Sequence, residues 1–184
     1  MADRRALWIN LYNGAVIDRA IAMGVQHSVK EVGGFFRRRW LQLAGERLSL
    51  NDIEHGFLRN NRRHPIGLLP PLWVRSRLAQ WIAQPFDARI HFALNCGARS
   101  CPPIGVYSND RIEEQLDLAT VSFLETEVEV TPQCGTINAN QILRWYRGDF
   151  ADMGGLEEML RHYRSDELEK RRWRFIWRPY DWRI

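Results

Sequence analysis

The chain has no long uncharged run and only three cysteines among its 184 residues. No stretch approaches the roughly 18–20 uncharged residues that cross a bilayer, so we expect no membrane partner. It also lacks the periods of collagen, coiled coils and repeat proteins. Eight Trp, eight Phe and five Tyr supply ample apolar surface, which excludes disorder as the dominant state.

Charge of one sign is only in slight excess, because 26 Lys and Arg stand against 22 Asp and Glu. Nearly all the cations are arginines, and they gather in short clusters such as Arg37–Arg39 and Arg62–Arg63. No helix-turn-helix, zinc-finger or RNA-recognition motif accompanies them. The clusters therefore indicate a solvated surface, and we predict no nucleic-acid partner.

The odd number of cysteines argues against a disulfide framework. The first residues, Met-Ala-Asp-Arg-Arg, lack the apolar segment of a secretory signal. We therefore expect a cytoplasmic protein whose thiols stay reduced and serve packing, catalysis or metal binding.

Hydrophobic periodicity predicts one α+β domain over residues 1–184, mostly helical with a small β-sheet. The first helix is apolar nearly all round, so it should be central and buried. A second helix opens at Ser49, with Asp52 completing a capping box. Further helices are predicted at 110–126, 139–148 and 156–163, a short amphipathic segment at 34–44, and strands at 89–94, 128–130, 136–138 and 173–178.

Two asparagines interrupt the apolar helix predicted over residues 6–23. Asn10 and Asn13 lie three residues apart and so share one edge of that helix. A buried carboxamide is costly unless it is hydrogen-bonded. We expect both side chains to bond to the 89–101 segment or to the 52–59 helix.

Reactive side chains concentrate between residues 91 and 101, where a predicted strand runs into a polar turn. The strand would deliver Cys96 to the end of a sheet, with Cys101 following in the turn. A thiolate nucleophile needs a nearby cation or imidazole to lower its pKa, and Arg99, His91 and His55 are the candidates. Spacing alone leaves both cysteines open, with Cys101 preferred because Cys96 continues the strand. Cys134, in a predicted hairpin turn, is expected to be incidental.

Several blocks of this sequence resemble the domain-of-unknown-function family number 547. They are Trp-Ile-Asn-Leu-Tyr-Asn at 8–13, Leu-Ser-Leu-Asn-Asp-Ile-Glu-His-Gly at 48–56, Arg-Ile-His-Phe-Ala-Leu-Asn-Cys-Gly-Ala-Arg-Ser-Cys-Pro-Pro at 89–103, and Tyr-Asp-Trp at 180–182. Trp-Tyr at 145–146 and Asp-Phe at 149–150 are similar to a further family block. The resemblance implies that these polar residues belong to the motifs: Asn10, Asn13, Glu54, His55, His91, Asn95, Cys96, Ser100, Cys101, Tyr180 and Asp181.

Two hypotheses from different classes follow. In the first, the protein is a thiol-dependent hydrolase or acyl transferase without a cofactor. Cys101 or Cys96 would attack a carbonyl, and His55 or His91 would act as base. Glu54, Asp52 or Asn10 would orient the imidazole, and amides around Gly97 would form the oxyanion hole.

In the second hypothesis, the protein is a non-catalytic module that binds a peptide or small molecule. Its polar cleft would use Asn10, Asn13, Asn95, Arg99 and Ser100. A thiol-redox role also stays open, whereas the Cys-x4-Cys spacing lacks the second pair typical of a zinc site, so no metal is predicted. A sulfur close to an imidazole in an open pocket would favour the enzyme, and two sulfurs packed in apolar surroundings would favour the binding module.

Overall fold

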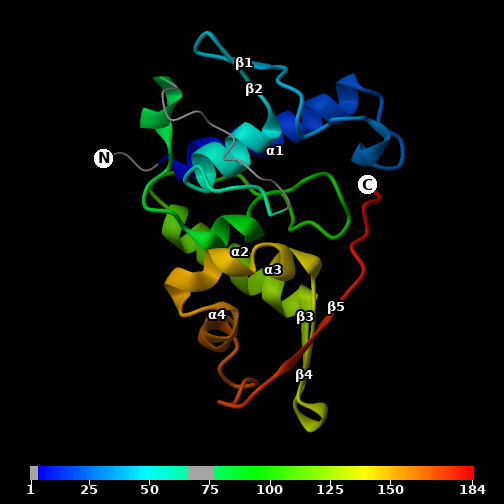
Figure 1. Ribbon diagram of the computed structural model, residues 1–184, viewed down its shortest axis with the longest axis vertical. Coiled ribbons are helices and arrows are strands. Elements are labelled where there is room, and N and C mark those ends of the chain that lie inside the picture. The colour runs from blue at the N-terminus through cyan, green and yellow to red at the C-terminus, as the bar shows by residue number, and fades with distance from the viewer. Residues whose placement is uncertain (1–3, 66–76) are drawn as a thin grey trace.

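The computed structural model describes residues 4–65 and 77–184, and all structural statements concern these residues. It has a mixed α+β fold with a helical majority and two small sheets, as the sequence predicts. Figure 1 shows α1 and the β1–β2 hairpin in one half of the molecule, and α2, α3, α4 and the second sheet in the other. The candidate site lies between these halves.

Helix α1 (Arg5–Ala22) matches the predicted first helix but is buried on one face rather than all round. Its buried face carries Trp8, Ile9 and Tyr12, each at most 1% exposed. Ile17 and Ile21, in contrast, are 43% and 76% exposed. The buried face packs on the segment that carries Phe57, whose ring stacks on Trp8 at a centroid distance of 4.0 Å.

The segment predicted at 34–44 is not one amphipathic element. It forms turns and then strand β1 (Leu41–Leu43), which pairs antiparallel with β2 (Glu46–Leu48). Ala44 and Gly45, between them, have φ of 50° and 83° and close this tight hairpin. A helix cannot continue through two consecutive residues with positive φ, so the chain turns here instead of forming one amphipathic element.

The capping box at Ser49 is confirmed. The Ser49 hydroxyl accepts a hydrogen bond from the backbone N–H of Asp52, and the Asp52 carboxylate accepts one from that of Ser49. The helix it opens is a π-helix, η2 (Asp52–Leu58), and every residue in it is buried. π-helices are rare, and those that occur often lie at functional sites, which makes this segment a candidate.

The strand predicted at 89–94 is wrong, because the segment is a 3-10 helix, η4 (Ala88–Phe92). Asp87 caps it by accepting a hydrogen bond from the Arg89 N–H at 2.9 Å. Ile90, His91 and Phe92 are all buried, so the chain has no exposed face here. A short, fully buried run does not distinguish strand from helix by periodicity.

Helix α2 (Ile112–Glu127) packs on η4 through Phe123 and Phe92, whose ring centroids lie 5.0 Å apart. It begins after Arg111 without a side-chain cap, two residues later than the predicted start at 110. The remaining elements of this half include the predicted hairpin and helices. They are β3 (Val128–Thr131), β4 (Thr136–Ala139), α3 (Gln141–Trp145), the 3-10 helix η6 (Arg147–Met153), α4 (Leu156–Tyr163) and β5 (Arg174–Trp177). Short 3-10 helices complete the set: η1 (Val29–Glu31), η3 (Arg77–Trp81) and η5 (Pro132–Cys134).

The second sheet has the order β3-β4-β5, with β5 parallel to β4 at the edge. The period of two is confirmed: Phe175 and Trp177 pack on the core, whereas Ile176 is 45% exposed. Beyond β5 the chain runs back toward α1, as Figure 1 shows. The backbone of Asp181 and Arg183 accepts hydrogen bonds from the loop at 95–101 that carries Cys96 and Cys101, called the thiol loop below. The backbone N–H of Ile184 donates to the carbonyl of His27.

Adjacent residues of β5 provide a matched test of this packing. Phe175→Ala should lower the free energy of unfolding by about 1.5–3 kcal/mol, because an apolar ring leaves the core face. Ile176→Ala, on the exposed face, should change it by under about 1 kcal/mol. Urea unfolding of both variants measures the difference, and equal losses would contradict the assignment of the two faces.

Candidate functional site

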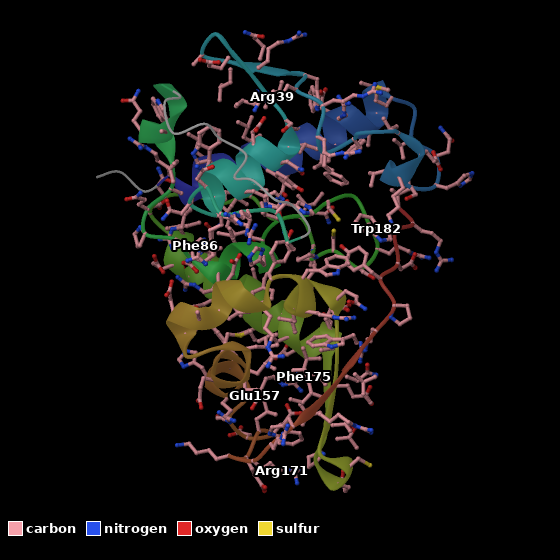
Figure 2. All side chains as sticks on the ribbon, viewed as in Figure 1. Arg39, Phe86, Glu157, Arg171, Phe175 and Trp182 are labelled. Atoms are coloured by element: carbon pink, nitrogen blue, oxygen red, sulfur yellow. The ribbon has the colours of Figure 1, made fainter. Side chains whose placement is uncertain are left out.

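A cavity of about 660 Å³ lies between the two halves of the molecule, and residues from the hydrophobic core of each half line it. Its wall is mostly aromatic and aliphatic, with contributions from α1, η1, η2, η4, α3 and the C-terminal segment. Figure 2 shows Trp182 on that segment, at a height between α1 and α3. All five candidate catalytic residues line this cavity: Glu54, His55, His91, Cys96 and Cys101.

The two thiols lie together and share one hydroxyl group. The Tyr180 hydroxyl lies 3.0 Å from the Cys101 sulfur and 3.2 Å from the Cys96 sulfur. The backbone N–H of Cys96 also donates to the Cys101 sulfur, with an N–S distance of 2.9 Å. The Cys101 sulfur therefore sits among donors that stabilise a negative charge.

The surroundings separate the acidities of the two thiols. A hydrogen bond from Cys96 lowers the pKa of Cys101, and hydrogen bonds from Tyr180 and from backbone amides add to this against the effect of burial. The same pairing with Cys101, together with burial, raises the pKa of Cys96 well above its usual range. Cys101 is therefore the more acidic thiol, in agreement with the preference drawn from the sequence.

The cations proposed to acidify the thiol do not do so. Arg99 is exposed and lies outside the cavity lining. Burial lowers the pKa of His55 to about 4 and lowers that of His91 as well, so both imidazoles are neutral at neutral pH. Among the residues that the structure describes, no hydrogen bond joins either sulfur to an imidazole.

Gly97 fixes how the thiol loop packs on the first half of the molecule. Its φ is 79°, and a Cβ there would lie 2.9 Å from Cγ1 of Val29 and 3.4 Å from Cγ1 of Val16. The Gly97 N–H donates to the Asn95 side chain at 2.7 Å. This amide is thus already engaged, and the oxyanion hole expected around Gly97 does not include it.

Glu54 supplies a buried carboxylate on the cavity wall. It accepts hydrogen bonds from the hydroxyls of Tyr12, at 3.2 Å, and Tyr146, at 2.5 Å. Burial would raise the pKa of Glu54, but neighbouring His55 and the bond from Tyr146 outweigh burial and lower it. Glu54 therefore orients the hydroxyls of two tyrosines. The imidazole of the neighbouring residue, His55, is held by Arg59.

His91 is oriented by a carboxylate that the sequence analysis did not assign to the site. Nε2 of His91 lies 2.8 Å from Oδ2 of Asp149, in helix η6. An ionised carboxylate only accepts, so Nε2 carries the proton and Nδ1 of the neutral ring keeps its lone pair. His91 therefore has the tautomer of a base that a carboxylate orients.

Asp149 also binds Arg59, just after η2, through two hydrogen bonds of 2.6 and 3.1 Å. Burial would raise the pKa of Asp149, but the bonds from His91 and Arg59 hold it well below its usual range. A further Arg59 nitrogen donates to Nδ1 of His55 at 3.1 Å. Neutral His55 then carries its proton on Nε2, so it is set up to donate rather than to act as base.

The five residues expected to bind a ligand lie outside the cavity wall and brace the fold. Asn13 is buried, donates to the carbonyl of Ala93 and accepts from the N–H of Asn95, as predicted. Asn10 is only half-buried, and it bonds to the N–H and carbonyl of Tyr107 rather than to either expected segment.

The other three expected ligand-binding residues hold the thiol loop and the C-terminal segment. Asn95 donates to the carbonyl of Pro102 at 2.7 Å and so closes the loop. The Ser100 hydroxyl accepts from the N–H of Asp181 at 2.9 Å. Arg99 contributes its backbone N–H to the carbonyl of Arg183. The polar cleft of the binding hypothesis is therefore not built from these residues.

The structure adds residues that sequence reasoning did not place in a site. Tyr180 bridges the thiols, Tyr12 and Tyr146 bond Glu54, and Asp149 bonds His91. All four lie in sequence blocks that resemble the family, at 8–13, 145–150 and 180–182, and this was the available signal. Tyr12 was hidden because it continues the apolar pattern of α1.

Within residues 4–65 and 77–184, no group of three or more His, Cys, Asp or Glu side chains could hold a metal ion. No helix in these ranges is long and apolar enough to cross a membrane.

The chain belongs to the family described as protein of unknown function, DUF547, whose family model matches residues 2–124. This confirms the resemblance seen in the sequence blocks. The matched range contains both thiols, both imidazoles and Glu54, whereas Tyr146, Asp149 and Tyr180 lie beyond it. No curated protein and no solved structure matches the chain.

The first prediction for this site concerns the brace at Asn13. Asn13→Ala should lower the free energy of unfolding by about 1–3 kcal/mol, because the carbonyl of Ala93 and the N–H of Asn95 lose their partner. Asn109→Ala, at an exposed position, should change it by less than about 0.5 kcal/mol. Chemical unfolding of both variants provides the comparison, and an unchanged Asn13→Ala protein would refute the bracing role.

The second prediction concerns Asp149. Asp149→Asn should destabilise the fold by about 3–5 kcal/mol at pH 7, because buried Arg59 loses its counter-charge. The folded-state pKa of Asp149 lies below its unfolded value of about 3.9, so its charge stabilises the fold above that pH. This contribution is lost as the pH falls toward the folded-state pKa.

The stability difference between wild type and Asp149→Asn should therefore narrow below about pH 4. Asp152→Asn is the matched control, since its carboxylate is 74% exposed and lies 3.7 Å from Arg62. Unfolding curves recorded between pH 3 and 7 test both statements. A difference that stays constant across this range would argue against an ionised Asp149 as the anchor.

Proposed function

We propose that the protein is a thiol-dependent hydrolase or acyl transferase in which Cys101 is the nucleophile. The observation that carries the proposal is the Cys101 sulfur at the wall of an open cavity. It faces the Tyr180 hydroxyl at 3.0 Å and the Cys96 N–H at 2.9 Å. These contacts lower the pKa of Cys101, and the thiolate is the nucleophilic form.

In the proposed reaction, the Cys101 thiolate attacks the carbonyl carbon of an acyl compound and a carbon–sulfur bond forms. The tetrahedral intermediate then breaks the bond to its leaving group, which departs as an anion and takes a proton from solvent to become an alcohol, thiol or amine. The Tyr180 hydroxyl and the Cys96 N–H are released from the sulfur as its charge moves to the carbonyl oxygen. Both donors are then available to that oxygen, in place of the amides around Gly97.

His91 is the proposed base for the second half of the reaction. It lines the same cavity, and Asp149 holds it with a lone pair on Nδ1. It would take a proton from water, or from an acceptor alcohol or amine, as that nucleophile attacks the acyl-sulfur carbon. The carbon–sulfur bond then breaks, which releases the acyl product and the Cys101 thiolate, and His91 gives its proton to solvent. His55 carries its proton on Nε2 because Arg59 occupies Nδ1, so we assign it no base role.

The cavity wall supports a substrate with an apolar body. Phe35, Phe36, Trp145 and Trp182 contribute rings to it, and its carboxylate, Glu54, is engaged by two tyrosine hydroxyls. A volume of about 660 Å³ is within the usual range of small-molecule sites. The proposal also requires reduced thiols, which fits the cytoplasmic location expected from the sequence.

One observation favours the alternative, a binding module without catalysis. The imidazoles engage Asp149 and Arg59, and the sulfur hydrogen bonds run to Tyr180 and to the loop itself. A ligand would then occupy the apolar cavity while the thiols hold the loop closed. The decisive difference between the two functions is whether Cys101 becomes acylated.

The test uses p-nitrophenyl acetate as an acyl probe. Wild type should release one equivalent of p-nitrophenolate in a burst and gain one acetyl group on Cys101, seen by peptide mass spectrometry. Iodoacetamide at pH 6.5 should label Cys101 well ahead of Cys134, because a free cysteine has a pKa of about 8.5. His91→Ala should keep the burst and slow the turnover that follows.

Cys134→Ala is the matched control, since that thiol is exposed in η5 and lies far outside the cavity lining. It should keep both the burst and the labelling of Cys101, whereas Cys101→Ala should lose the burst. If Cys101 reacts with neither probe until the protein is unfolded, the enzyme proposal fails and the binding module replaces it.

A further inference from the structure

The two thiols of the cavity have contacts that an acyl transferase with one nucleophile does not require. Cys96 and Cys101 both lie within hydrogen-bond distance of the hydroxyl of Tyr180, with their sulfurs at 3.2 and 3.0 Å from it. The backbone N–H of Cys96 donates to the Cys101 sulfur, with an N–S distance of 2.9 Å, so the loop brings the two cysteines into contact. A single nucleophile needs a stabilised sulfur, but it does not need a second thiol beside it.

We propose that Cys96 and Cys101 are a dithiol–disulfide pair that exchanges with low-molecular-weight disulfides in this cavity, with Cys101 as the attacking thiol and Cys96 as the resolving thiol. The proposal goes beyond acyl transfer, because it gives Cys96 a chemical role. It rests on the mutual position of the sulfurs in the cavity wall, and the acyl-transfer reaction does not depend on it.

The exchange proceeds in two balanced steps. The Cys101 thiolate attacks one sulfur of the small disulfide, forms a mixed disulfide and releases the other half as a thiolate, which takes a proton from solvent. The Cys96 thiol gives its proton to solvent and attacks the Cys101 sulfur. The Cys96–Cys101 disulfide forms and the second half of the small disulfide leaves as a thiol.

The asymmetry of the site suits these two roles. Exchange is fastest for a thiol whose pKa is near the ambient pH, and the site lowers the pKa of Cys101 while raising that of Cys96. Cys96 then becomes reactive only when the mixed disulfide has removed the charge beside it. Both sulfurs line the open cavity, so a small disulfide reaches them without unfolding the chain.

The Tyr180 hydroxyl is a positioning group in this scheme. It lies between the sulfurs and donates to whichever carries the charge, so it favours the thiolate of Cys101 before attack and that of Cys96 after it. Oxidation would also remove the acyl-transfer nucleophile, which makes the disulfide state inactive toward carbonyl compounds.

The experiment uses the full chain with Cys134→Ser, so that only the two cavity thiols remain. Incubation with oxidised glutathione should remove both free thiols and lower the intact mass by two hydrogen atoms. Dithiothreitol should restore both thiols and the p-nitrophenyl acetate burst. Adding Cys96→Ser should halt the reaction at a glutathione adduct on Cys101. Cys101→Ser should react at least about tenfold more slowly, because Cys96 is the less acidic thiol.

A persistent glutathione adduct in the protein with both thiols would overturn the inference, because Cys96 would then fail to resolve it. Adduct formation on Cys96 ahead of Cys101 would overturn the assignment of roles. Tyr180→Phe separates positioning from structure: it should slow adduct formation on Cys101 and move its pH profile to higher pH at unchanged unfolding free energy. The acyl burst of the reduced Cys134→Ser protein, which keeps both cavity thiols, reports the proposed function independently, so the two proposals fail separately.

Discussion

The buried carboxylate of Asp149 is the interaction on which the rest of the site depends. It binds Arg59, which follows η2, and His91, which lies in η4, so one charge ties three separate segments of the chain together. Arg59 in turn reaches His55, and the His91 ring stacks on Tyr146 at 3.8 Å. Without that negative charge, the buried guanidinium of Arg59 would lose its counter-ion and His91 would lose the group that fixes its orientation.

The thiol side of the cavity follows a different physical principle. Neutral donors, rather than the Arg99, His91 or His55 cations expected from the sequence, contact the Cys101 sulfur in a partly buried loop. Hydrogen bonds to the charged form of a group lower its pKa even where burial alone would raise it. The site therefore combines an ionic cluster, which sets imidazole tautomers, with a neutral donor cluster, which sets thiol acidity.

Periodicity predicted the elements that have one exposed face. Helix α2, the β3–β4 hairpin and the alternation of Phe175 with Ile176 were all recoverable in this way. It failed at η4, where four of the five side chains are buried and no exposed face distinguishes a strand from a helix. It also failed at the β1–β2 turn, because positive φ at Ala44 is not encoded in hydrophobicity.

The same limits apply to the candidate site. The sequence located the reactive residues, and all five candidate catalytic side chains reach one cavity. It could not identify their partners, because Tyr12 reads as a core residue and Asp149 is 58 positions from His91. The sequence correctly predicted that the side chain of Asn13 is hydrogen-bonded. A carboxamide whose hydrogen bonds are made within the protein stabilises the fold and is not free to bind a ligand.

Cys101 and Tyr180 are 79 positions apart in the sequence, so the ribosome makes the thiol well before the hydroxyl that contacts it. A ribosome adds about 5–20 residues per second, so Tyr180 is made about 4–16 s after Cys101. During that interval the thiol loop exists without the hydroxyl that later stabilises its charge. The nascent chain therefore lacks one of the contacts that lower the pKa of Cys101 until β5 has docked and the following segment has reached the loop.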